Sequence, residues 1–257
     1  YAKCRQITDA CKVFHGLHEK NIVSWSTIIS GFVEIGDNHQ SLKMFEEMES
    51  KEGASTSNKS TLSCILKVCS CIGALMQGRE IHTKIIKFGF ESDRAVINGL
   101  IDMYAKCGSL DEAQQVLSVY DSSLVDLASW GALIHGYCQH GKMSLATQCL
   151  EKMQKQGLKL NNIILTSLLN ACSHSGQLQE GIKISKNMAN VGIPSIENVT
   201  TMVDLLGVNG CVDEAKHYLR SVPQLHSSNA SCFPLLTACR MHGDIETGHQ
   251  SYAQINS

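Results

Sequence analysis

The sequence predicts an all-α fold, an α-solenoid of stacked helix-turn-helix repeats, because three features recur along its 257 residues. A glycine that can end a helix returns at nearly constant spacing. A small residue follows it early in the next helix, and a pair of apolar residues precedes it. A unit of two short helices leaves one apolar face uncovered, so such units are stable only when neighbours of the same kind stack on them.

The glycine column sets the period of the array. Its members recur about every 34 residues, the spacing of two-helix repeats. Glycine readily takes the left-handed conformation that ends a helix, so each one predicts a corner between two helices. The corner glycines are Gly36, Gly73, Gly108, Gly141, Gly176, Gly210 and Gly243.

Two further columns predict how the units pack. Small residues early in the second helix indicate that two helices approach closely there: Ala10, Ser41, Gly78, Ala113, Ala146, Gly181, Ala215 and Gly248. Paired apolar residues in the first helix predict a shared inner face: Ile28 with Ile29, Ile65 with Leu66, Leu100 with Ile101, Leu133 with Ile134, Leu168 with Leu169, Met202 with Val203, and Leu235 with Leu236. The columns together favour a single array.

The segment 94–126 shows the unit most clearly. Apolar residues at helical spacing predict a first helix that ends before Gly108. Ser109 followed by Glu112 predicts a capping box at the start of the second helix. Trp25 and Trp130 stand at matching places in other units and are interpreted as core residues rather than stacking platforms.

Composition limits the functions that are open. The formal charge is −2, so there is no overall basic footprint, and any nucleic-acid binding has to be local. No apolar run approaches the roughly 20 residues of a membrane span. The 12 cysteines fall in repeat columns and never as CxxC, which favours reduced core thiols over zinc or disulfide sites. We expect no metal and no cofactor.

A longer period of three alternating unit types carries a family resemblance. IVSWSTIISGFVEIGDNHQSLKMFEEM, CSCIGALMQGREIHTKIIKFGFESD and LIDMYAKCGSLDEA are typical of three motif types, called P, L and S. The chain resembles a plant pentatricopeptide repeat protein of the class with alternating P, L and S motifs. Because 1–4 match 104–107, we expect the chain to open inside a repeat.

The resemblance implies a right-handed superhelix and assigns each unit. The expected array spans 1–228, and 229–257 resembles the start of the E region that follows such arrays. Its motifs are a partial S at 1–21, P at 22–58, L at 59–93, S at 94–126, P at 127–161, L at 162–195 and S at 196–228.

The resemblance also implies binding of single-stranded RNA, one nucleotide per repeat, on the inner surface. In this family the fifth and last residues of a motif select the base. The corresponding pairs are Ser26 with Asn58, Ser63 with Asp93, Asn98 with Asp126, Gly131 with Asn161, Thr166 with Ser195, and Thr200 with Ser228. The family code implies adenine for the first pair, guanine for the second and a pyrimidine, with uracil favoured, for the third. The other three pairs receive no base.

Two further roles follow from the resemblance. The second residue of a motif wedges between bases, which points to Val23, Ala95, Ala128 and Ile163. A lysine near the end of the first helix meets phosphate, which points to Lys3 and Lys106. A simpler reading stands beside these roles, because Ser, Thr, Asn and Asp near a helix start also serve as caps.

The resemblance implies an organellar protein, in the mitochondrion or chloroplast, that recognises a transcript near a C-to-U editing site and positions the editing activity. Accessory editing-factor proteins are the expected partners. We expect no enzyme in these residues, since the H-x-E and P-C-x-x-C zinc signature of deaminases is absent. Two alternatives remain: a subunit of an organellar ribonucleoprotein, for RNA processing or in a ribosome, and a tetratricopeptide-like protein scaffold.

Overall fold

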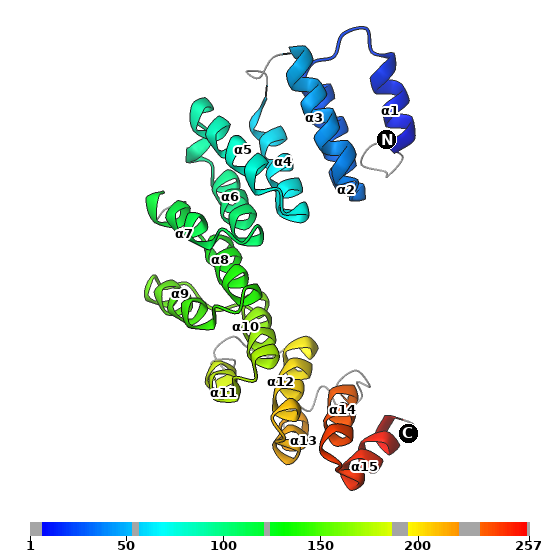
Figure 1. The fold of residues 1–257 in the computed structure, drawn as a ribbon, viewed down its shortest axis with the longest axis vertical. Coiled ribbons are helices and arrows are strands. Elements are labelled where there is room, and N and C mark those ends of the chain that lie inside the picture. The colour runs from blue at the N-terminus through cyan, green and yellow to red at the C-terminus, as the bar shows by residue number, and fades with distance from the viewer. Residues whose placement is uncertain (1–6, 53–56, 121–123, 187–194, 221–231, 256–257) are drawn as a thin grey trace. The chain divides into compact units, whose positions relative to one another are not determined.

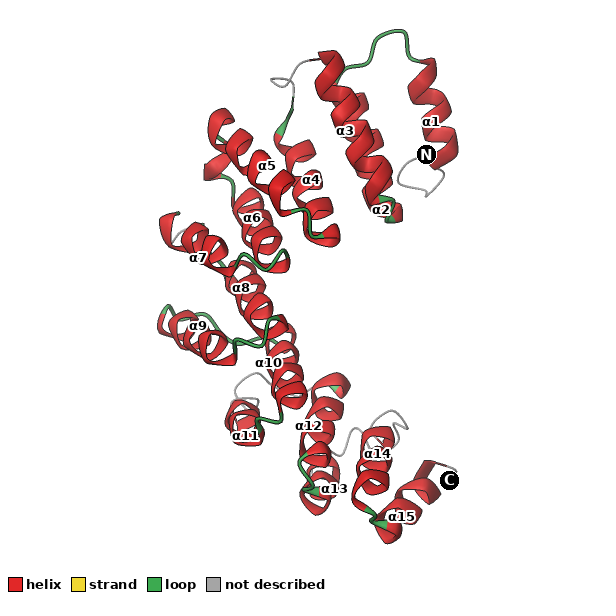
Figure 2. Ribbon diagram, viewed as in Figure 1, coloured by secondary structure: helices red, strands yellow, loops and turns green. Residues whose placement is uncertain are grey.

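The computed structural model describes residues 7–52, 57–120, 124–186, 195–220 and 232–255. All regular structure in these ranges is helical, as Figure 2 shows, so the predicted all-α fold is confirmed. The chain divides into two compact units, Tyr1–Gly136 and Tyr137–Ser257, and the division falls within helix α8. No helix in the described ranges combines the length and apolar character needed to cross a membrane.

The first unit is a series of short helices joined by tight corners (Figure 1). Its elements are α1 (Ile7–Gly16), α2 (Ile22–Ile35), α3 (Asn38–Glu52), α4 (Lys59–Ile72), α5 (Leu75–Phe88), the 3₁₀ turn η3 (Phe90–Ser92), α6 (Arg94–Lys106), α7 (Leu110–Val119) and α8 (Leu127–Gln139), whose last turn belongs to the second unit.

The second unit continues the same pattern. Its elements are α9 (Met143–Lys155), α10 (Asn162–Ser175), α11 (Leu178–Lys186), α12 (Ile196–Val208), α13 (Val212–Arg220), α14 (Cys232–His242) and α15 (Ile245–Ile255).

Within each unit the hairpins stack through their first helices. Helix α4 contacts both α2 and α6, and α12 contacts both α10 and α14. The second helix of each hairpin packs on its own first helix, as α3 does on α2 and α5 on α4. The starts of successive first helices therefore lie next to one another. Helices α2, α4, α6, α8, α10 and α12 begin at the first residues of the six predicted full repeats: Ile22, Lys59, Arg94, Leu127, Asn162 and Ile196.

All seven corner glycines adopt positive φ, from 65° at Gly176 to 81° at Gly36, so the predicted corners are confirmed. The column of small residues holds with one difference. A Cβ on Gly78 would lie 2.3 Å from Met103 Sδ, and one on Gly181 would lie 2.1 Å from Leu205 Cδ2. A Cβ on Gly248 would make ordinary contact at 3.6 Å, so packing does not require glycine there.

The predicted capping box at Ser109 and Glu112 is wrong. The Ser109 side chain makes no hydrogen bond to the helix backbone and donates to the Glu112 carboxylate instead. The Arg79 guanidinium of α5 holds that carboxylate, with Nη2 2.8 Å from Oε2, so it does not reach back to the cap. A complete capping box starts α2, between Asn21 and Ser24.

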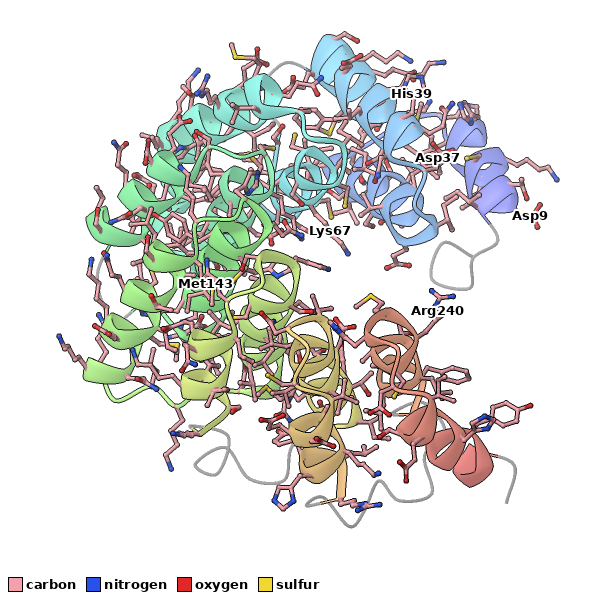
Figure 3. The ribbon with its side chains drawn as sticks, turned by 60° about the horizontal axis from the view of Figure 1, so that its bottom comes forward. Asp9, Asp37, His39, Lys67, Met143 and Arg240 are labelled. Atoms are coloured by element: carbon pink, nitrogen blue, oxygen red, sulfur yellow. The ribbon has the colours of Figure 1, made fainter. Side chains whose placement is uncertain are left out.

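The interior matches the predicted core. Trp25 is fully buried and Trp130 nearly so. Burial raises the pKa of the Cys138 and Cys172 thiols to about 12, which keeps them protonated. Polar side chains such as those of His39 and Lys67, labelled in Figure 3, are exposed.

Candidate nucleic-acid interface

The last residue of a predicted repeat caps the first helix of the next. Asn58 Oδ1 accepts from Thr61 N at 2.8 Å, and Asp93 Oδ1 accepts from Ala95 N at 2.9 Å. The same role falls to Asp126, Asn161 and Ser195 at α8, α10 and α12. The capping interpretation of these residues is therefore correct, and it uses their acceptor oxygens. It leaves the amide hydrogens of the asparagines for other partners.

The amide of Asn58 binds Ser26, the fifth residue of its own predicted repeat. Asn58 Nδ2 donates to Ser26 Oγ at 3.0 Å, although 32 positions separate the two residues. Ser26 Oγ also donates to Ile22 O of its own helix, at 2.6 Å. Stacking of α4 on α2 thus brings this sequence-predicted pair together.

Asn98 and Asp126 are joined in the same way. Asn98 Nδ2 donates to Asp126 Oδ1 at 3.3 Å, and the Ser129 hydroxyl donates to Asn98 Oδ1. The guanidinium of Arg94 lies 3.9 Å from Asp126 Oδ2. The pair therefore connects the first turns of α6 and α8.

Ser63 and Asp93 are not joined by a hydrogen bond, although both lie in the described part of the chain. Asp93 Oδ2 instead accepts from Lys59 Nζ at 2.6 Å. This hydrogen bond to an ammonium group lowers the pKa of the Asp93 carboxyl.

The remaining pairs are arranged differently. Thr166 Oγ1 binds Asn198 Oδ1 at 2.5 Å, while the predicted partner Ser195 accepts from the Asn198 backbone N at 3.2 Å. Thr200 Oγ1 donates to Ile196 O of its own helix at 2.8 Å. Its predicted partner Ser228 lies outside the described residues. Gly131 lies on α8 and has no side chain to offer.

The predicted wedge residues are exposed. Val23 retains 65% and Ile163 76% of its accessible surface, and Ala95 and Ala128 are also exposed. Each stands three positions before a fifth residue, so it lies one helical turn away on the same side of the helix.

Of the two predicted phosphate lysines, Lys3 lies outside the described residues. Lys106 Nζ forms an ion pair with Asp102 Oδ2 at 2.9 Å, one turn earlier on α6. Burial, reinforced by the charge of Lys106, lowers the pKa of the neighbouring His135.

The sequence interpretation missed three polar residues at this interface. Thr61, Ser129 and Asn198 are each fully buried at the third position of a first helix. Val96 and Ile164 occupy that position in other repeats, so a polar residue in an otherwise apolar column was the available signal.

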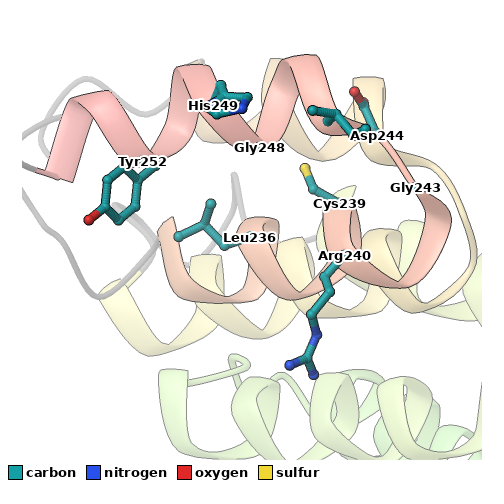
Figure 4. A pocket seen from close by; sticks show the side chains of 9 residues that line it. Leu236, Cys239, Arg240, Gly243, Asp244, Gly248, His249 and Tyr252 are labelled. Carbon is teal, nitrogen blue, oxygen red and sulfur yellow. The ribbon is translucent and has the colours of Figure 1, made fainter.

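A separate groove of about 460 Å³ opens between α14 and α15 (Figure 4). Leu236, Cys239 and Tyr252 help to line it, and none of the predicted base-selecting, wedge or phosphate residues does. This groove is therefore distinct from the predicted interface.

Comparison with protein families places repeats over much of the chain. The model described as PPR repeat matches residues 23–52, 96–119 and 163–193, and that described as PPR repeat family matches 125–174. These matches begin close to the starts of α2, α6, α8 and α10.

Known proteins that contain this repeat also match most of the chain. A chloroplastic pentatricopeptide repeat-containing protein of Arabidopsis thaliana is 35% identical over 99% of this chain and 34% of its own length. A mitochondrial one from the same plant is 34% identical over 96% of this chain and 44% of its own length. The chain thus spans between a third and a half of these relatives.

A crystal structure of the pentatricopeptide repeat protein PPR10, in complex with an 18-nt psaJ RNA element, shares the fold. The TM-score is 0.77 at 17% identity, over 97% of this chain and 38% of that chain. Repeat period, hairpin stacking, family models and relatives agree, and the chain belongs to the pentatricopeptide repeat family.

Proposed function

We propose that this chain binds single-stranded RNA in a base-dependent manner, one nucleotide facing the start of each first helix. The supporting observation is that stacking joins Asn58 to Ser26 and Asn98 to Asp126 across neighbouring repeats. Each asparagine keeps a second amide hydrogen beyond that bond. Such groups can hydrogen-bond the Watson–Crick edge of an unpaired base.

The exposed apolar residues support the same ligand. Val23 and Ile163 gain little from folding where they stand, because apolar burial is what stabilises the folded state. Beside a splayed-out base they offer an apolar surface against which its ring can stack. Ala95 and Ala128 supply a smaller contact of this kind.

The base preferences that we propose for each repeat come from the family. The relative PPR10 carries an RNA element in its crystal structure. For this chain the family code proposes adenine at Ser26 and Asn58, guanine at Ser63 and Asp93, and uracil at Asn98 and Asp126. The division of the repeats into P, L and S motifs, with an E-like region from 229 onward, belongs to the same proposal.

For the whole protein we propose recognition of an organellar transcript near a C-to-U editing site, with accessory editing factors as partners. The relatives include chloroplastic and mitochondrial proteins, which supports an organellar location. Sequencing organellar transcripts from plants that lack the protein tests this role. Unchanged editing at every site would exclude it.

RNA binding itself is tested with the 257-residue chain. Filter binding with a single-stranded RNA of about eight nucleotides, its duplex and the matching DNA should show tightest binding to the single-stranded RNA. A protein-binding scaffold would show no saturable RNA binding, and that result would exclude the proposal.

A further inference from the structure

Three of the first helices carry a polar side chain where the stacking surface is otherwise apolar. Thr61, Ser129 and Asn198 occupy the third position of α4, α8 and α12, and each has no exposed surface. A buried polar group is costly unless it is hydrogen-bonded. In all three cases the partner includes the fifth residue of the preceding repeat.

Ser129 shows what the contact does. Its hydroxyl accepts from Asp126 N at 3.2 Å and donates to Asn98 Oδ1. Asn98 Nδ2 at the same time donates to the Asp126 carboxylate at 3.3 Å. A carboxylate only accepts, so the Asn98 amide has one satisfied orientation, with its oxygen toward Ser129 and its nitrogen toward Asp126.

Thr61 plays the same part at the first complete repeat. Its Oγ1 lies 2.7 Å from Ser26 Oγ and 2.9 Å from Asn58 Oδ1, and its single hydrogen can be donated to either oxygen. Asn58 Nδ2 closes the cycle on Ser26 Oγ at 3.0 Å. Rotating the Asn58 amide by half a turn would place its NH₂ group against the Thr61 backbone N–H, so the helix cap fixes this amide. The Thr61 hydroxyl adds a contact to both Ser26 and Asn58.

At Asn198 the hydroxyl and the amide occupy the opposite positions from those at Ser129. Here the fifth residue, Thr166, supplies the hydroxyl and the third residue of the next repeat supplies the amide, with 2.5 Å between Oγ1 and Oδ1. Asn198 Nδ2 is held by Asn162 Oδ1 at 3.1 Å. The side chain that orients Thr166 is thus Asn198 rather than Ser195.

The repeat that begins with α6 has an apolar third residue and provides the contrast. Val96 is fully buried on α6 and offers no hydrogen bond from its side chain. There Ser63 and Asp93 are not joined, and Asp93 turns to Lys59. In the described repeats, a fifth residue is therefore hydrogen-bonded across the stacking surface where the third residue of the following repeat is polar.

We propose that the third residue of a following repeat is a positioning residue, which fixes the hydrogen-bonding direction of the base-selecting side chain before it. This inference rests on the proposed RNA binding. Thr61 acts on Ser26 and Asn58, Ser129 acts on Asn98, and Asn198 acts on Thr166. A fixed amide presents donor and acceptor in one order and so favours one base, whereas a freely turning amide presents both orders.

The test compares base preference at two repeats. Ser129→Ala removes the hydroxyl beside Asn98. In this variant the preference for the favoured base facing Asn98 should fall from about tenfold or more to about threefold or less. Preference at the base facing Ser26 should stay unchanged. Thr61→Val, of nearly the same shape, should give the opposite pattern. Ser129→Thr keeps a hydroxyl and should restore the preference.

Val96→Ala is the matched control, because it alters packing at the same position without removing a hydrogen bond. It should change affinity for all RNAs alike and leave every base preference as it was. If Ser129→Ala also changes affinity alike for all bases, the third residue is only structural and the inference is overturned.

A readout without RNA separates this inference from the proposed function. In the free protein, nuclear magnetic resonance of the Asn98 side-chain amide should show one slowly exchanging hydrogen, the one donated to Asp126, with faster exchange in Ser129→Ala. Equal exchange in the two proteins would overturn the positioning role. Absence of RNA binding by the unaltered chain would overturn the proposed function, while the amide signals still report on Ser129.

Discussion

Two residues hydrogen-bond the side-chain amide of Asn98, which can make further hydrogen bonds. It donates one amide hydrogen to Asp126 and accepts one hydrogen from Ser129. A second hydrogen and a second lone pair remain, and these match the acceptor and donor along the edge of a pyrimidine. Asp126 also caps α8, which fixes the carboxylate in space and makes it a stable reference for the amide.

Changing Asn98→Thr while keeping Asp126 should move this repeat toward guanine. A short hydroxyl leaves room for a purine, and the carboxylate of Asp126 can accept from the purine edge. The preference should shift by about tenfold to about a hundredfold, the range of about 1 to 3 kcal/mol seen for side-chain readout of a base. Binding constants for RNAs that differ only at the facing base measure the shift. A folded variant that still prefers uracil would contradict the Asn98 assignment.

At the scale of elements, the spacing of stacked helices depends on small residues where two helices approach closely. Gly136 of α8 lies against α6, where an added Cβ would stand 2.6 Å from Ala105 Cβ and 3.3 Å from Ala105 Cα. A backbone atom cannot swing aside as a long side chain can. The first helices can therefore stack in this register only while both residues stay small.

Gly136→Ala should lower the unfolding midpoint, since overpacking costs about 1 to 3 kcal/mol. Gly248→Ala is its matched control in α15, where an added Cβ makes ordinary contact at 3.6 Å from Cys239 Cβ. There alanine should stabilise by up to about 1 kcal/mol through helix propensity. Thermal and urea unfolding compare the two. Equal effects of both substitutions would contradict the packing argument.

A second inter-element feature is the hydrogen-bond chain around His82 of α5. His82 Nδ1 lies 2.9 Å from Tyr104 Oη on α6, and Nε2 lies 3.5 Å from Tyr120 Oη, just after α7. Burial lowers the pKa of His82, although the nearby carboxylates of Glu91 and Glu112 oppose the shift. The folded protein therefore favours neutral His82.

Because the pKa of His82 is lowered in the folded protein, acid should destabilise the fold. The unfolded chain binds a proton at His82 as pH falls below about 6.5, before the folded state does, so acid favours unfolding. The unfolding midpoint should fall between about pH 7.5 and about pH 5.5, and His82→Gln should reduce the slope. His39→Gln, which removes an exposed histidine, is the control. An unchanged slope in His82→Gln would refute this role.

At the scale of the whole molecule, the formal charge of −2 shapes how RNA would be held. Neutral hydrogen-bonding side chains dominate the candidate interface, and Lys106 and Lys59 are already paired with carboxylates. Recognition would then depend on base contacts more than on phosphate contacts, which makes binding less sensitive to salt than is usual for basic RNA-binding proteins.

We therefore expect a shallow salt dependence. With about two phosphate contacts, affinity should fall less than about tenfold between about 50 and about 200 mM salt, because each contact with single-stranded RNA contributes about −0.7 to the logarithmic slope. Filter binding across that range measures it. A loss of about a thousandfold would mean that phosphate contacts, and not base contacts, dominate the binding.

The sequence was sufficient for whatever depends on local periodicity. The glycine corners, the start of each first helix and the buried tryptophans follow from spacing and residue type, since a left-handed corner and an apolar stripe depend on a few neighbouring residues. The pairing of fifth and last residues came from family resemblance. The capping box at Ser109 was wrong because Arg79, from another helix, took the Glu112 carboxylate.

By itself, then, the sequence determined the repeat and its helices, and the family resemblance supplied the positions of the candidate base-selecting residues. Only the tertiary structure decided which of those residues meet. It joined Asn58 to Ser26 and Asn98 to Asp126, and it turned Asp93 to Lys59 and Thr166 to Asn198. The physical reason is that each of these contacts joins groups about one repeat apart, and the buried third residue between stacked helices selects the hydrogen bonds that can form.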